Sequence, residues 1–106
     1  MEASKGVKMM KELSLRIAAP VIYQRMIQTF EKYHIHPYDT QGTAIPKEDG
    51  LHIILRFAPD FSRKAETTFS MKQASQPDQE VTHFFEKTAE QCKSELITNY
   101  FKMIKP

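Results

Sequence analysis

The stretch LHIILRF at residues 51–57, followed by AETTFSMK at residues 65–72, decides the fold of this chain. In both segments apolar side chains alternate with polar or charged ones over most of the length, which is typical of β-strands with one buried face. Only the short polar segment 58–64 separates them, so we expect the two strands to pair as an antiparallel hairpin. The face that this hairpin is predicted to bury consists of Leu51, Ile53, Leu55, Phe57, Ala65, Thr67, Phe69 and Met71.

A third strand is predicted ahead of the hairpin. The segment PKEDG at residues 46–50 contains a proline, charged residues and an Asp-Gly pair, which together indicate a turn. The segment before it, residues 38–46, has the pattern of a short strand, and Gly42 within it is expected to mark a bend or a bulge. These signals extend the hairpin to three antiparallel strands.

Residues 11–20, KELSLRIAAP, leave two structures open. Leu13, Leu15 and Ile17 alternate with polar residues, as in a strand. Leu13 and Ile17 also lie four residues apart, which is the spacing of a helix. We favour a strand, which would give a sheet of three to four strands.

Two amphipathic helices complete the pattern. The segment 20–34 begins with a proline that suits a first helical turn, and its apolar residues recur every three or four positions. The second helix is predicted to begin near Pro77, with Ser75 or Gln76 as its N-cap, and to continue to about Ile104. A helix of about 26 residues would be ~39 Å long, which exceeds the length of a small sheet.

These segments predict an α+β fold: a small three- to four-stranded antiparallel sheet with two helices packed on one face, the C-terminal helix being long. The 106 residues suit one domain, which we assign to residues 9–106, after a mobile N-terminal extension formed by residues 1–8. No apolar run approaches the ~20 residues that span a bilayer, so no membrane partner is expected. The single cysteine excludes an intrachain disulfide and favours a cytoplasmic location.

The histidines of the segment EKYHIHPYDT do not predict a metal site. His34 falls in the last turn of the first predicted helix, whereas His36 precedes Pro37 and is therefore expected to be extended. The two rings are then not held by one rigid element, and nothing in the spacing of Asp39 or His52 forces further ligands to converge on them. We predict surface histidines, with neither a metal nor another cofactor.

The sequence also lacks the common signatures of catalysis. It contains no phosphate-binding glycine loop, nucleophile elbow or HExxH motif. Cys92 falls in the middle of the last predicted helix, between the apolar residues Ala89 and Leu96, so a buried structural thiol is expected rather than a nucleophile. Glu48 and Asp49 lie together in a turn and are expected to be solvated rather than to form an acid/base pair. The chain is therefore predicted not to be an enzyme.

Four cations and a histidine gather around the hairpin. Arg56 and Lys72 are expected on its outward face, Arg63 and Lys64 in the connecting loop, and His52 beside them. Such a group could hold a phosphate or a carboxylate, although charged side chains on strand edges also deter aggregation. A small acidic-ligand or anion-binding domain is therefore the alternative function.

Nucleic acid is disfavoured as a partner of this hairpin. The net charge of +2 is far below that of a strongly basic nucleic-acid-binding domain. The outward strand positions also offer Ile54 where a nucleic-acid platform would present aromatic side chains for stacking. Protein surfaces are the more plausible target.

The end of the C-terminal helix gives the preferred function. Its apolar residues, which include Tyr100, Phe101 and Ile104, form a stripe wider and longer than one small sheet can cover. We therefore predict a non-enzymatic binding or regulatory module that acts through protein contacts. Its partner would be a second copy in a homodimer or another protein, held by this helix and by the polar outward face of the sheet.

Overall fold

The computed structural model describes residues 11–36, 39–57 and 61–104, with side chains described as far as Thr98. The proposed extension at residues 1–8 lies outside these residues. In the described chain four strands form one antiparallel sheet in the order β1-β2-β3-β4, which confirms the predicted α+β fold. The elements in chain order are β1 (Leu13–Ser14), α2 (Leu15–Ala18), α3 (Pro20–Lys32), β2 (Gln41–Lys47), β3 (Gly50–Phe57), β4 (Arg63–Ser70), α4 (Met71–Ser75) and α5 (Gln79–Ile104).

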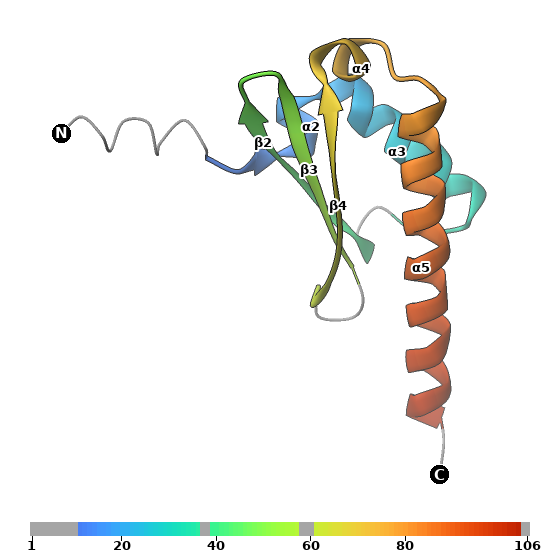
Figure 1. Ribbon diagram of the computed structural model, residues 1–106. Coiled ribbons are helices and arrows are strands. Elements are labelled where there is room, and N and C mark those ends of the chain that lie inside the picture. Colours follow the sequence, from blue (N-terminus) through green and yellow to red (C-terminus); the bar gives the residue numbers. More distant parts are fainter. Residues whose placement is uncertain (1–10, 37–38, 58–60, 105–106) are drawn as a thin grey trace, which may run out of the picture.

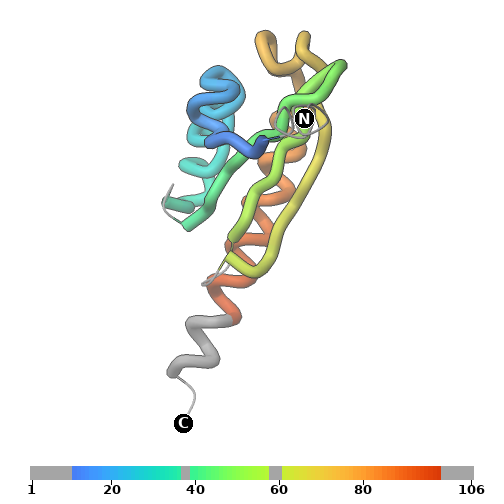
Figure 2. Tube along the Cα trace, turned by 90° about the vertical axis from the view of Figure 1, so that its left-hand side faces the viewer, coloured from blue at the N-terminus to red at the C-terminus, as the bar shows by residue number. Residues whose placement is uncertain are grey.

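The two long helices, α3 and α5, lie on the same side of the sheet (Figures 1 and 2), and α5 continues past the ends of strands β3 and β4 (Figure 1). The rings of Phe30 in α3 and Phe85 in α5 meet edge to face, with centroids 6.2 Å apart, in the arrangement that aromatic pairs prefer. Leu51, Ile53 and other inward side chains of β3 complete this core. The apolar faces of helices and sheet thus cover one another, as the sequence predicted.

The β2–β3 hairpin turns within two residues, because Lys47 pairs directly with Gly50. The register then continues without interruption through Gly42, which pairs with Leu55. The predicted bend or bulge at Gly42 is therefore wrong. A Cβ atom at this position would lie 3.2 Å from the side chains of both Leu15 and Leu55, so close packing is the physical reason for a small residue there.

Strand β4 ends earlier than its alternating pattern predicts. Ser70 begins helix α4 through a capping box: its hydroxyl accepts a hydrogen bond from the Gln73 N–H at 3.1 Å, and the Gln73 side chain accepts one from the Ser70 N–H at 2.9 Å. Met71 and Lys72 therefore belong to α4. Met71 is 57% exposed, so its predicted place on the buried face is wrong.

The ambiguous segment 11–20 contains both predicted structures. Leu13 and Ser14 form β1 and pair with β2, and the chain then enters the short helix α2. The strand prediction is therefore right for two residues only. The change to helix leaves Leu15 fully buried and Ile17 71% exposed, whereas a continued strand would have placed both on one face.

Helix α3 ends at Lys32, and the prediction that His34 belongs to its last turn is wrong. The His34 N–H donates to the Glu31 carbonyl and the Ile35 N–H to the Phe30 carbonyl, both at 3.0 Å. With His34 at φ 60°, these bonds form a Schellman motif. The motif returns Ile35 to the core, where it is 4% exposed.

Helix α5 is capped by Asp78 and not by the predicted Ser75 or Gln76. One carboxylate oxygen of Asp78 accepts hydrogen bonds from the N–H groups of Glu80, at 3.1 Å, and Val81, at 3.3 Å. An acidic N-cap satisfies the first N–H groups of a helix and complements its positive end.

Candidate functional site

The sheet face opposite α3 and α5, called here the outer face, carries most of the predicted polar site. Its central positions alternate with the inward-facing residues of β3 and β4, and cross-strand partners face the same way. His52 pairs with Thr68, Ile54 with Glu66 and Arg56 with Lys64. No helix of the described residues covers this face (Figure 2).

A glutamate joins two of the predicted cationic residues on the outer face. His52 Nε2 lies 2.7 Å from Glu66 Oε1, and Lys64 Nζ lies 3.2 Å from Glu66 Oε2. The other ring nitrogen of His52 is 3.1 Å from the Thr68 hydroxyl. The hydrogen bond from His52, followed by that from Lys64, holds the pKa of Glu66 below its usual value.

A second polar group surrounds Arg56. Its Nη1 donates to Glu12 Oε2 at 2.7 Å, and the same carboxylate oxygen accepts a hydrogen bond from the Thr43 hydroxyl. The hydrogen bonds from Thr43 and from Arg56 lower the pKa of Glu12. Arg56 is thus neutralised by a residue that precedes β1, which the hairpin sequence alone could not indicate.

The remaining two predicted cations lie away from the outer face. Arg63 and Lys64 begin β4 instead of lying in a loop as predicted. The Arg63 guanidinium forms an ion pair at 2.9 Å with Glu95 of α5, on the helix side of the sheet. Lys72 belongs to α4 rather than to an outward strand position. The structure therefore corrects the expected placement of all three residues and divides the predicted basic patch.

This division changes the electrostatics of the hairpin. On the outer face, Arg56 and Lys64 are balanced by Glu12 and Glu66. A phosphate or carboxylate ligand would have to compete with these two glutamates for the cations. The arrangement is better suited to polar contacts over an extended surface than to capture of a small anion.

The histidines and the cysteine do not form a site with each other. The His36 N–H donates to a carboxylate oxygen of Asp39 at 3.2 Å, a local turn contact. Across the described residues, no group of three histidine, cysteine, aspartate or glutamate side chains could hold a metal ion. Cys92 is fully buried within the core, as expected of a structural thiol.

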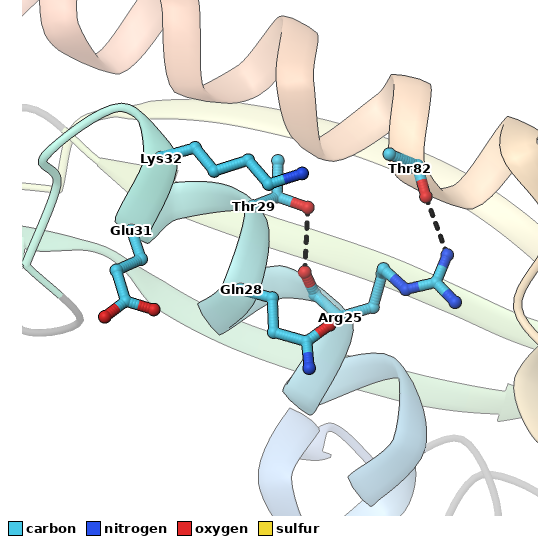
Figure 3. Close-up of a pocket in the computed structure, with 6 residues that line it drawn as sticks. All are labelled: Arg25, Gln28, Thr29, Glu31, Lys32 and Thr82. Carbon is cyan, nitrogen blue, oxygen red and sulfur yellow. Dashed lines mark hydrogen bonds between the residues drawn. The ribbon is translucent and has the colours of Figure 1, made fainter.

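A hollow that was not predicted from the sequence lies between α3 and the start of α5. This hollow has a volume of about 650 Å³, and Figure 3 shows the side chains that line it. Arg25 Nη1 donates to the Thr82 hydroxyl at 2.7 Å and so links the two helices. The lining residues are Arg25, Gln28, Thr29, Glu31, Lys32 and Thr82.

The spacing of residues along α3 could have indicated one wall of this hollow. Arg25 and Lys32 are separated by two turns on the polar side of α3, so both can border the same groove. The other wall is Thr82, and its place depends on how α5 packs beside α3. Nothing in the local pattern of either helix specifies that packing.

The predicted contact surface at the end of α5 lies largely beyond the described side chains. Leu96 is half-buried against the core and Ile97 is 48% exposed. The helix itself continues to Ile104. The side chains of Tyr100 and Phe101 lie outside the described residues, so their role in a contact stays a prediction.

No helix in the described ranges combines the length and the apolar character needed to cross a membrane. The comparisons that could have related this chain to known proteins found no matching family model, no matching curated protein and no matching solved structure.

Proposed function

We propose that the protein is a non-enzymatic binding or regulatory module, and that it forms a homodimer through the C-terminal part of helix α5. The observation that carries the proposal is the mismatch between the length of α5 and the part of it that packs on the domain. The helix runs from Gln79 to Ile104, whereas the last fully buried residue among its described side chains, which extend to Thr98, is Cys92. Leu96 is the last described side chain of α5 that packs against the core, and about a third of the helix, residues 97–104, follows it.

The sequence of this last third supports a protein contact. Residues 97, 100, 101 and 104 are Ile, Tyr, Phe and Ile, at the spacing that repeats along one side of a helix. At ~100° per residue, this stripe is turned by roughly 100° from the line through Phe85, Ala89 and Cys92 that faces the core. Ile97, the first member of the stripe, is already 48% exposed, so the stripe begins as the core contact ends.

A second copy is the partner that we favour for this stripe. Two such helices placed side by side offer each other the same apolar positions, and a two-fold interface needs this kind of self-complementarity. The aromatic residues at 100 and 101 are of the type enriched at the centre of protein interfaces. Another protein with a matching helix remains the competing occupant, and the experiment below separates the two.

The outer face of the sheet is the second part of the proposed recognition surface. Arg56 and Lys64, each held by a carboxylate, present fixed donors and acceptors at half-buried to exposed positions. Preformed polar groups of this kind contribute orientation and specificity in protein contacts. Lys72, which the sequence predicted on this surface, does not belong to it, because it lies on α4.

A cytoplasmic location is part of the proposal, since the one cysteine cannot form an intrachain disulfide. The alternative function, capture of an acidic ligand by the hairpin cations, is not favoured because those cations are paired with Glu12, Glu66 and Glu95. Removal of these carboxylates, rather than addition of ligand, would be needed to expose the positive charge.

Sedimentation equilibrium over a wide range of protein concentration tests the dimer. The variant Ile97→Glu places a charge at the start of the stripe and is expected to be monomeric, whereas the unmodified protein dimerises. Ile17→Glu is the matched control, because Ile17 is 71% exposed on α2; it should dimerise normally. Far-UV circular dichroism of both variants checks that α5 still forms.

A monomer at every concentration for the unmodified protein would refute self-association. Equal dimerisation of Ile97→Glu and the unmodified protein would place the contact elsewhere. If the protein is monomeric, Tyr100→Arg and Ile17→Glu can be compared in capture experiments from native lysate. A partner lost only with Tyr100→Arg would identify a heterologous contact at the same stripe.

A further inference from the structure

The hollow between α3 and the first turns of α5 differs from the outer face in its charge balance. Its two basic side chains, Arg25 and Lys32, have no carboxylate partner among the described residues. Arg25 is half-buried and Lys32 is exposed. In contrast, Arg56, Lys64 and Arg63 all take part in ion pairs.

The direction of the side chains concentrates positive charge inside this hollow. In Figure 3 the Lys32 ammonium group points along α3 toward the Thr29 hydroxyl, and the Arg25 guanidinium group reaches across to Thr82. The Glu31 carboxylate, the one acidic group of the lining, points away from both cations in this view. Glu31 therefore does not pair with either cation of the hollow.

Hydrogen bonds within the hollow fix its donors. The Thr29 hydroxyl donates to the Arg25 carbonyl at 2.8 Å, which occupies its proton. The Arg25 guanidinium uses Nη1 for the Thr82 hydroxyl at 2.7 Å, and a guanidinium carries five N–H groups in total. The Thr82 hydroxyl accepts this bond and so keeps its own proton for another acceptor.

Thr82 also lies in the first turns of α5, near the positive end of the helix. Asp78 offsets part of that positive field, because it caps the first N–H groups of the helix. Farther along the groove the charge reverses: burial, followed by the carboxylates of Glu90 and Glu86, raises the pKa of Tyr33. Acidic side chains of α5 therefore lie near the Lys32 end of the groove, and Arg25 with Thr82 forms its basic end.

We propose that this hollow binds the phosphate group of a small phosphomonoester. Arg25 and Lys32 supply two positive charges for a group that carries about −1.5 to −2 at pH 7. The Thr82 hydroxyl and the Gln28 amide add neutral donors. A volume of about 650 Å³ exceeds what phosphate alone requires, so the remainder of the ester lies toward the open side of the hollow.

Amide chemical shifts in a ¹⁵N-labelled sample, titrated with inorganic phosphate and separately with glycerol phosphate, test the proposal. Saturable shifts are expected at Arg25, Lys32 and Thr82 with either compound. Acetate, a monoanion, should bind at least several-fold more weakly. Loss of one charge-assisted contact lowers affinity by about 10- to 100-fold, so Arg25→Gln and Lys32→Gln should each produce a decrease of that size.

Lys47→Gln is the matched control, because it removes the same charge from the exposed end of β2. It should leave the affinity for phosphate unchanged. Should Arg25→Gln fail to fold through loss of the α3–α5 link, Lys32→Gln carries the test, since Lys32 is exposed. Equal effects of Lys47→Gln and Lys32→Gln, equal binding of acetate and phosphate, or the absence of saturation would each overturn the proposal.

This site is separate from the stripe on α5, so the two proposals can fail independently. Ile97→Glu should abolish dimerisation and leave the phosphate-induced shifts at Thr82 in place. Lys32→Gln should weaken phosphate binding and leave the sedimentation behaviour unchanged. The same labelled samples serve both measurements.

Discussion

Replacement of Gly50 by alanine should destabilise the protein far more than the same replacement at Gly42. Gly50 begins β3 and pairs with Ser70 of β4. A Cβ atom at Gly50 would lie 2.3 Å from the Phe69 carbonyl oxygen and 3.2 Å from its carbonyl carbon. Both are backbone atoms of the neighbouring strand, so the clash cannot be relieved by rotation of a side chain.

The size of the effect follows from the movement that alanine requires. The Phe69 carbonyl oxygen would have to retreat by roughly 1 Å to reach an ordinary van der Waals distance, which loosens the end of the β3–β4 ladder. Overpacking of this kind costs about 1–3 kcal/mol, and a weakened backbone hydrogen bond adds ~1 kcal/mol. Alanine returns about 0.4–1 kcal/mol by restricting the unfolded chain, which leaves a net loss of about 1–3.5 kcal/mol.

Gly42 provides the matched control. A Cβ atom there would lie 3.2 Å from the Cδ2 atoms of Leu15 and Leu55, and leucine side chains can shift by a few tenths of an ångström. The unfolded-state gain from alanine then nearly offsets the packing cost, so Gly42→Ala is expected within about 1 kcal/mol of the unmodified protein. Neither glycine has a positive φ, so backbone strain does not contribute to the comparison.

Urea unfolding followed by far-UV circular dichroism measures both variants. All samples should be compared at one protein concentration, because dimerisation would link apparent stability to concentration. A loss of under 0.5 kcal/mol for Gly50→Ala would refute the reasoning, since it would mean that the ends of β3 and β4 separate at little cost. Equal losses at Gly42 and Gly50 would show that the backbone clash is not the deciding factor.

Three further predictions concern the core, the outer face and the thiol. Phe85→Ala should lower the free energy of unfolding by about 3–5 kcal/mol in the same urea assay, because the ring is fully buried against Phe30. The pKa of Glu12 is lowered in the folded state, so its interactions contribute stability above the usual value of 4.5 and lose it as the pH falls below that value. Glu12→Gln should therefore be less stable than the unmodified protein at neutral pH, with the difference diminishing in acid; a difference independent of pH would contradict the assignment. Cys92 is 0% exposed, so a disulfide reagent should label it slowly in native buffer and quickly in urea, and fast native labelling would argue against a buried thiol.

The sequence specified the long elements better than their ends. Alternation over residues 51–57 predicted β3 correctly because each inward side chain of that strand is buried. The same alternation continues through Met71, but there a local signal prevails: Ser70 and Gln73 form a capping box and turn the chain into α4. Side-chain periodicity and capping therefore favour different structures at strand ends. The chain adopts the one with the better backbone hydrogen bonds.

The end of α3 shows the same limitation. The apolar pattern continues to the histidine segment, yet the Schellman motif places His34 in a left-handed conformation and ends the helix at Lys32. Glycine is the usual residue at such a position, and asparagine is the common substitute. A histidine gives no such signal in the sequence, so the helix end could not be located from the residues alone.

The predicted basic patch failed as a cluster for reasons of topology. Residue types and local spacing located Arg56, Arg63 and Lys64 near one hairpin, which the structure bears out. They could not reveal that Glu12, far away in the sequence, lies against Arg56. Nor could they show that β4 begins at Arg63, which directs this side chain to the helix side of the sheet and toward Glu95.

The position of β4 at the edge of the sheet has a consequence for the behaviour of the chain at high concentration. Within the described residues β4 pairs with β3 alone. The other edge of this eight-residue strand can therefore pair with a strand of another molecule, as in cross-β growth. Arg63, Lys64 and Glu66 place ionic groups along this edge. A second strand that paired there would have to desolvate them. Resistance to fibril formation would then depend on the same ion pairs that give the sheet its polar surface.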